Sequence, residues 1–113
     1  MKTELCAYSV DACRVAARLG VNRVELCASP AEGGVTPSVA TIERVAQIDG
    51  LDLSVMIRPR GGDFLYSDDE FETMLLDIER ARTAGATGVV FGILTADGRV
   101  DVDFMFINGV DGI

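Results

Sequence analysis

Short apolar segments alternate with amphipathic segments along the chain, and each apolar segment has the length of a strand. In the clearest amphipathic segment, between residues 68 and 84, apolar residues recur at i, i+3, i+4 and i+7, which is the period of one helix face. The alternation of strands and helices predicts an α/β fold with a parallel sheet and right-handed crossovers. Strands are expected over residues 3–8, 21–27, 51–57 and 87–94, and helices over residues 10–20, 36–50 and 68–84.

Capping residues predict where the three helices begin. The hydroxyls of Ser9 and Ser67 can each accept a hydrogen bond from a backbone N–H of the first turn, and Glu70 completes a capping box with Ser67. For the second helix, Thr36 is followed by Pro37, a residue favoured at the first helical position. We therefore expect the second helix to begin at this pair.

Polar side chains share one face of the first two predicted strands. Alternation puts Glu4 and Cys6 on one side of the first strand, and Glu25 and Cys27 on one side of the second, while the apolar residues between them face the helices. In a closed barrel the polar side is the interior, where unpaired charges are costly. A purely structural barrel would carry Val, Ile and Leu there. This face therefore predicts a functional site.

The loop after the third predicted strand is cationic. It contains Arg58 and Arg60, separated by Pro59 and followed by a pair of glycines. Two arginines two residues apart at a strand end project to the same side, because side chains alternate with period 2. We expect them to stand beside Glu4 and Glu25 at the carboxyl ends of the strands, where they could bind an anion. The alternative is that they only neutralise neighbouring carboxylates.

The two cysteines of the polar face suit a soft metal ion. Cys6 and Cys27 lie on neighbouring predicted strands, and with the thioether of Met56 they form a ligand set that favours Cu(I). The alternative is that small thiols only pack, which is the expectation for Cys13 on a helix face. The residues alone leave both interpretations of Cys6 and Cys27 open.

The carboxylates of the same face offer a competing chemistry. Glu4 or Glu25 could act as a general acid or base, while Arg58 and Arg60 bind a small anionic substrate. That combination predicts a barrel enzyme, although no particular reaction follows from these residues. The alternative is a buried salt-bridge network without catalysis.

The composition disfavours some classes of binding partner and indicates the kind of compartment in which the protein works. A net charge of -8 disfavours nucleic acid and anionic membranes, and no apolar run has the length of a membrane span. Three cysteines without paired spacing favour a reducing compartment over a disulfide scaffold, and no signal-peptide pattern precedes the first strand. The chain has no histidine, so a metal site or acid–base chemistry would depend on thiols, carboxylates, Arg, Lys or Tyr.

Several motifs along the chain, in the same order, resemble the CutC family of copper homeostasis proteins. The resemblance is specific, because it consists of several long motifs rather than one short one. It includes the first two predicted strands and the cationic loop, and so the candidate site residues themselves. The motifs occupy residues 4–9, 22–27, 32–38, 56–64, 66–68 and 88–94.

The resemblance implies a cytoplasmic, self-associating TIM-type barrel linked to copper handling. Cys6 and Cys27 match the thiols proposed to hold Cu(I) in this family. A complete (β/α)₈ barrel needs about 250 residues, so the 113 residues here correspond to a partial barrel of about four βα units. We expect residues 1–103 to form the amino-terminal half of such a barrel, and residues 104–113 to be a divergent tail of a truncated chain.

A half barrel leaves strand edges open and its inner face uncovered, which favours self-association.

The residues and the resemblance together leave three hypotheses about function. The first is a copper homeostasis protein with Cys6 and Cys27 as ligands, surrounded by a polar shell of Glu4, Glu25 and the two arginines. The second is a barrel enzyme acting on a small anion, and the third is a non-functional fragment.

Overall fold

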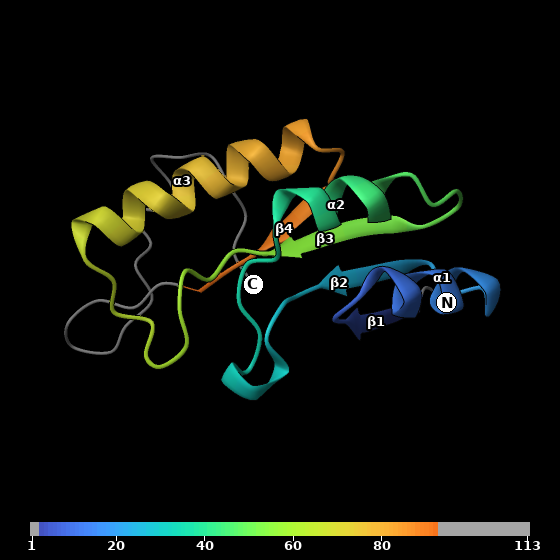
Figure 1. The fold of residues 1–113 in the computed structure, drawn as a ribbon, viewed down its shortest axis with the longest axis horizontal. Helices are drawn as coiled ribbons and strands as arrows, with labels where there is room; N and C mark the ends of the chain where they lie inside the picture. The colour runs from blue at the N-terminus through green and yellow to red at the C-terminus, as the bar shows by residue number, and fades with distance from the viewer. Residues whose placement is uncertain (1–2, 93–113) are drawn as a thin grey trace.

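The computed structural model describes residues 3–92, which form one parallel sheet with helical crossovers (Figure 1). The strand order is β1-β2-β3-β4, so every strand pairs with its neighbour in the sequence. The predicted end of the fourth strand at residue 94 and the predicted tail at residues 104–113 lie outside this part of the chain. The elements are β1 Glu4–Ala7, α1 Val10–Arg18, β2 Arg23–Leu26, the 3-10 helix η1 Pro30–Glu32, α2 Val39–Ala46, β3 Asp52–Met56, α3 Asp68–Thr83 and β4 Gly88–Val90.

The sheet has the architecture of part of a TIM-type barrel. All three strand pairs are parallel, and their register aligns Glu4 with Arg23 and Arg23 with Asp52. A parallel sheet whose strands follow the chain order, with a helix in each connection, is the repeating unit of the (β/α)₈ barrel. The predicted fold class, a partial barrel of about four βα units, is confirmed.

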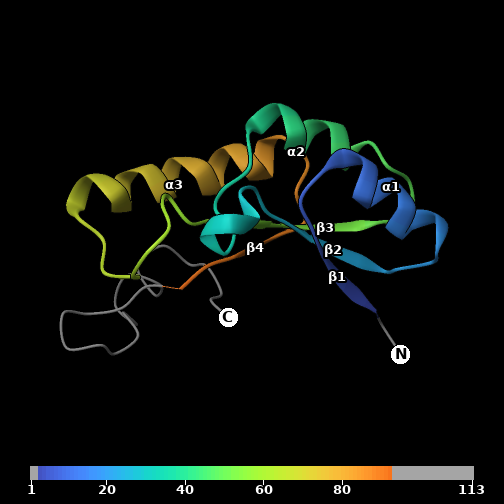
Figure 2. The ribbon, with the colours of Figure 1, turned by 60° about the horizontal axis from the view of Figure 1, so that its bottom comes forward.

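The three α-helices cover one face of the sheet, and the core lies between the two layers (Figure 2). Val24, Leu26 and Val55 point from the strands into this layer and are fully buried. Met74 and Ile78 meet them from α3. Burying a side chain of this size contributes about 1.5–3 kcal/mol, so the apolar set of each strand fixes which face meets the helices.

Two of the three predicted helix starts are confirmed. The Ser9 hydroxyl accepts a hydrogen bond from the backbone N–H of Ala12, at 3.1 Å. Ser67 and Glu70 form the complete capping box at the start of α3. The prediction for α2 is wrong, because Ser38 rather than Thr36 caps this helix.

The hydroxyl of Thr36 is already engaged elsewhere. It accepts a hydrogen bond from the Arg58 backbone N–H at 2.8 Å and lies 3.2 Å from the Arg58 carbonyl oxygen, to which it donates. The Thr36 backbone N–H donates to the same carbonyl at 3.0 Å. Thr36 therefore fastens the loop after β2 to the loop after β3, and α2 begins only after it. This contact between distant segments is invisible in the local sequence.

No helix within residues 3–92 covers the opposite face of the sheet (Figure 2). That face carries the polar side chains of β1 and β2 that alternation had assigned to the barrel interior. None of the helices in the described ranges is long and apolar enough to cross a membrane.

Candidate metal centre

Three potential metal ligands come together on the face of the sheet that the α-helices leave uncovered, called the inner face below. The Sγ atoms of Cys6 and Cys27 lie 3.7 Å apart, and the ligand atoms of Cys6, Glu25 and Cys27 all lie within 4.8 Å of one another. Cys6 is in register with Glu25 on the neighbouring strand. Cys27 follows the last residue of β2, and its backbone N–H donates to the carbonyl of Ala7 at 2.9 Å. The parallel ladder thus places both thiols at one point of the sheet.

The two thiols differ in their access to solvent. Cys6 is exposed on β1, whereas Cys27 is only 2% exposed. Burial, followed by the hydrogen bond to Cys6 and the nearby charge of Glu25, raises the pKa of Cys27 to about 12. Since a thiol binds metal as its thiolate, a metal ion at this site must displace the proton of Cys27.

Glu25 is the carboxylate nearest to the thiols. Its Oε1 atom lies 4.0 Å from the Sγ atom of Cys27. Partial burial and the negative charge of Glu4 raise the pKa of Glu25 above its usual value. Glu25 is therefore more easily protonated than a carboxylate in water. It can accept the proton that Cys27 releases, or complete a ligand set with the two sulfurs.

A short loop after β2 closes over Cys27. Ala28 and Val35 form an antiparallel bridge, with backbone hydrogen bonds of 2.9 Å in both directions. This turns Gly34 back onto Cys27, where a Cβ atom added to Gly34 would lie 3.3 Å from the Cys27 Cβ. Gly34 also has a φ angle of +99°, which L side chains rarely adopt. Both observations explain why a glycine occupies this position.

Tyr8 and Gly34 contribute to the site, but sequence reasoning did not include them among its candidates. A hydrogen bond to Cys6 raises the pKa of the Tyr8 hydroxyl, which is 3.8 Å from the position of a Gly34 Cβ. Alternation along β1 did put Tyr8 on the same face as Cys6, so a signal for it existed. No local signal connects Gly34 to Cys27, because their contact depends on how the loop folds back.

Arg58 is buried and links two loops by hydrogen bonds, so its guanidinium group is not free to bind an anion. Its guanidinium group donates to the backbone carbonyls of Glu32 at 2.8 Å, Gly34 at 3.2 Å and Gly62 at 2.7 Å. The Cζ atom lies 4.8 Å from the ring centroid of Phe64, which is the geometry of a cation–π contact. Arg58 thus holds the loop that carries Gly34 against the loop that follows β3.

Arg60 is engaged within its own loop and with the start of α3. Its Nε atom lies 2.6 Å from Glu70 and its Nη2 atom 3.2 Å from Asp63. Arg60 also donates to the Leu65 carbonyl at 2.8 Å. The expectation that both arginines stand beside Glu4 and Glu25 is therefore wrong. Strand β3 ends at Met56, so the period of 2 does not continue through Pro59.

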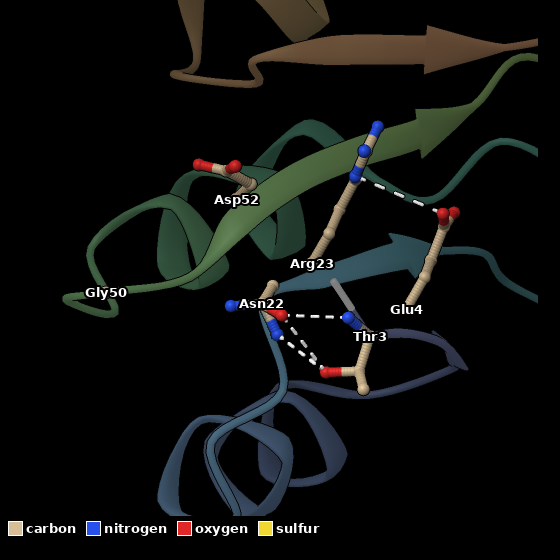
Figure 3. Close-up of a pocket in the computed structure, with 6 residues that line it drawn as sticks. All are labelled: Thr3, Glu4, Asn22, Arg23, Gly50 and Asp52. Atoms are coloured by element: carbon tan, nitrogen blue, oxygen red, sulfur yellow. Dashed lines mark hydrogen bonds and ion pairs between the residues drawn. The ribbon is translucent and has the colours of Figure 1, made fainter. Parts of the chain in front are cut away.

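Glu4 lies at the amino ends of the strands, and its predicted place at the carboxyl ends is wrong. It is the first residue of β1, and one of its carboxylate oxygens is 4.0 Å from the Nε atom of Arg23 (Figure 3). Both side chains are partly exposed, so this pair contributes at most about 1 kcal/mol. A polar pocket of about 420 Å³ surrounds the pair and is lined by Thr3, Glu4, Asn22, Arg23, Gly50 and Asp52.

The two other sulfur-bearing candidates, Met56 and Cys13, lie in different parts of the fold. Met56, the third soft donor suggested by the sequence, ends β3 and is half-buried. Cys13 is fully buried in the core on α1, which confirms the expectation that it packs. Of the six predicted site residues, the structure therefore brings together Cys6, Glu25 and Cys27.

The sequence is similar to proteins of one known family over nearly its whole length. The model of the CutC family matches residues 1–107. A CutC protein of Bacteroides fragilis is 54% identical over 103 residues, which are 90% of this chain and 41% of that protein. A CutC protein of Klebsiella pneumoniae is 47% identical over 102 residues, which are again 90% of this chain and 41% of that protein. The chain thus spans about two fifths of the length of these relatives.

The fold is likewise similar to a solved structure. A crystal structure of a protein from Streptococcus agalactiae, provisionally described as a copper homeostasis protein CutC, matches with a TM-score of 0.86 at 35% identity. The match covers 99% of this chain and 58% of that chain. Sequence and fold agree, and the chain belongs to the CutC family.

Proposed function

We propose that this chain takes part in copper homeostasis by binding Cu(I) through Cys6 and Cys27. The observation that carries the proposal is the contact of two thiol sulfurs, 3.7 Å apart, on the inner face of the sheet. Thiolates are soft ligands that select Cu(I) over hard cations. The description of the similar Streptococcus agalactiae protein supports the same assignment. Copper is here the cargo of the protein rather than a cofactor of a reaction.

The spacing of the sulfurs is compatible with a single ion between them. With metal–sulfur bonds of about 2.3 Å, the value for zinc thiolates, sulfurs 3.7 Å apart subtend an angle of about 107° at the ion. A linear pair would need sulfurs about 4.6 Å apart. The present spacing therefore favours a bent arrangement with room for a third donor, and Glu25 lies within reach of it.

The alternative function, an enzyme that acts on a small anion, has less support. It required Arg58 and Arg60 as an anion clamp. In the structure Arg58 donates to three backbone carbonyls, and Arg60 is paired with Glu70 and Asp63. An anion would have to compete with these existing partners. Because the chain spans only part of its relatives, any activity of the complete barrel is likewise a proposal.

A competition titration with a chromophoric Cu(I) chelator tests the proposal under anaerobic conditions. We expect the chain to withdraw one Cu(I) from the chelator, and the Cys6→Ser/Cys27→Ser double variant to withdraw none. Cys13→Ser is the control, since it removes the one remaining thiol, which lies in the core away from the site. Unchanged binding in the double variant would overturn the assignment.

A further inference from the structure

The two cysteines of the candidate centre are also placed to react with each other. Their sulfurs are 3.7 Å apart, and the residues are held on neighbouring strands by the parallel ladder. All three cysteines of the chain are free thiols in this structure. Cys13 is buried on α1, so Cys6 and Cys27 are the pair in contact.

We propose that Cys6 and Cys27 are a thiol–disulfide redox site, which a low-molecular-weight disulfide such as glutathione disulfide oxidises to an intramolecular cross-strand bridge. This inference does not depend on copper binding. It names a covalent modification of the site and the chemical class of its oxidant.

The two sulfur atoms are already in contact. A disulfide has an S–S distance of about 2.05 Å, so the two sulfurs must approach by about 1.7 Å from their present 3.7 Å. Both residues lie at margins of the described sheet. Cys6 is on β1, which pairs only with β2 among the described strands, and Cys27 comes directly after the last residue of β2.

The difference in exposure sets the order of the two steps. Cys6 is exposed and can meet a soluble disulfide, whereas Cys27 is 2% exposed and has its sulfur 3.7 Å from that of Cys6. The Cys6 thiolate attacks one sulfur of glutathione disulfide, the S–S bond of the reagent breaks, and one glutathione thiolate leaves. Cys27 then attacks the Cys6 sulfur and releases the second glutathione.

The reaction is balanced without a further reagent. Two protein thiols lose two electrons and two protons, and glutathione disulfide gains them to become two molecules of glutathione. Glu25, whose carboxylate is 4.0 Å from the Cys27 sulfur, is placed to accept the proton from Cys27. The reverse reaction with excess glutathione restores both thiols.

Oxidation would control metal binding, and this consequence alone rests on the proposed function. A disulfide presents no thiolate, so the bridged protein cannot offer the pair of soft ligands that Cu(I) requires. The redox state of the surroundings would then decide whether the site accepts copper.

The test treats the full chain, freed of metal with a chelator, with glutathione redox buffers, followed by acid quenching, alkylation and intact mass analysis. We expect a monomer that has lost two hydrogen atoms and has one alkylatable thiol, and a digest that links the peptides of Cys6 and Cys27. Three alkylatable thiols in the most oxidising buffer would overturn the proposal. A stable glutathione adduct on Cys6, or a disulfide-linked dimer, would overturn it equally.

Single variants check the order of the steps. Cys27→Ser should stop at the glutathione adduct on Cys6, and Cys6→Ser should remain unmodified at Cys27. Cys13→Ala should form the bridge as the wild type does, which would assign the remaining thiol to Cys13. Since the protein is free of metal, a failed Cu(I) titration leaves this result standing, and a failed oxidation leaves the Cu(I) titration standing.

Discussion

Replacing Arg58 with alanine tests whether this buried guanidinium group holds the two loops of the site together. The change removes hydrogen bonds to the carbonyls of Glu32, Gly34 and Gly62, which lie on both sides of the arginine in the sequence. Arg58 is 9% exposed, so water cannot simply take the place of its whole side chain. The variant should lose stability, and the loop that carries Gly34 should loosen.

The size of the stability loss depends on whether water can solvate each carbonyl in the variant. A hydrogen bond to a charged group contributes about 1.5–3 kcal/mol. Glu32 and Gly62 are exposed, so water can solvate their carbonyls in the variant, whereas Gly34 is buried. The loss should therefore be smaller than the sum of three bonds, at about 3–5 kcal/mol. That is a large part of the total stability of about 5–15 kcal/mol expected for a small domain.

Urea unfolding followed by circular dichroism measures this loss. Arg14→Ala is the matched control, because Arg14 is an exposed arginine 3.5 Å from Asp11, and a surface pair of this kind contributes about 0–1 kcal/mol. Arg58→Lys should give an intermediate loss, since an ammonium group keeps the charge but not the planar fork of donors. In a Cu(I) titration, Arg58→Ala should also bind more weakly, because Gly34 is no longer held against Cys27.

A small loss of stability would contradict this role of Arg58. If Arg58→Ala costs no more than Arg14→Ala, the three carbonyl contacts do not hold the loops. If Arg58→Ala unfolds the chain altogether, Arg58→Lys still provides the comparison.

Three further changes test other parts of the account. Raising the pH should raise the apparent Cu(I) affinity of the wild type by about tenfold per pH unit, because binding displaces the proton of Cys27. An affinity that does not depend on pH would contradict this. Gly34→Ala should lower the free energy of unfolding by about 1–2 kcal/mol because of its positive φ, and should also weaken Cu(I) binding because the added Cβ presses on Cys27. The control Gly20→Ala, at a φ of +80° with open space around it, should lose stability but keep its Cu(I) affinity. Equal effects of the two variants on Cu(I) binding would contradict the contact between Gly34 and Cys27. Ser67→Ala should lower the free energy of unfolding by about 1 kcal/mol through loss of the cap of α3, and an unchanged melting temperature would contradict the capping box.

Periodicity predicted the parts of this structure that depend on neighbouring residues. Alternation identified the inner face of β1 and β2, and with it the meeting of Cys6, Glu25 and Cys27. The burial pattern of α3 and its cap at Ser67 also follow from local sequence. Such predictions hold because side-chain direction is fixed wherever the backbone is regular.

The loops could not be predicted in the same way. The two arginines were extrapolated from the alternation of β3, but the strand ends before them, and the conformation of the following loop decides where they point. Thr36 was expected to cap α2, yet it fastens two loops that are distant in the sequence. Gly34 meets Cys27 for the same reason. Long-range loop contacts depend on the assembled fold, and no local pattern encodes them.

X-ray absorption at the copper edge of the Cu(I)-loaded chain reports directly which atoms coordinate the ion. We expect two sulfur atoms to coordinate copper. One sulfur should be lost in Cys6→Ser and one in Cys27→Ser, while Cys13→Ser should keep both. A copper environment of oxygen and nitrogen alone, or one that none of these variants changes, would contradict the proposal that the paired thiols of the inner face hold the ion.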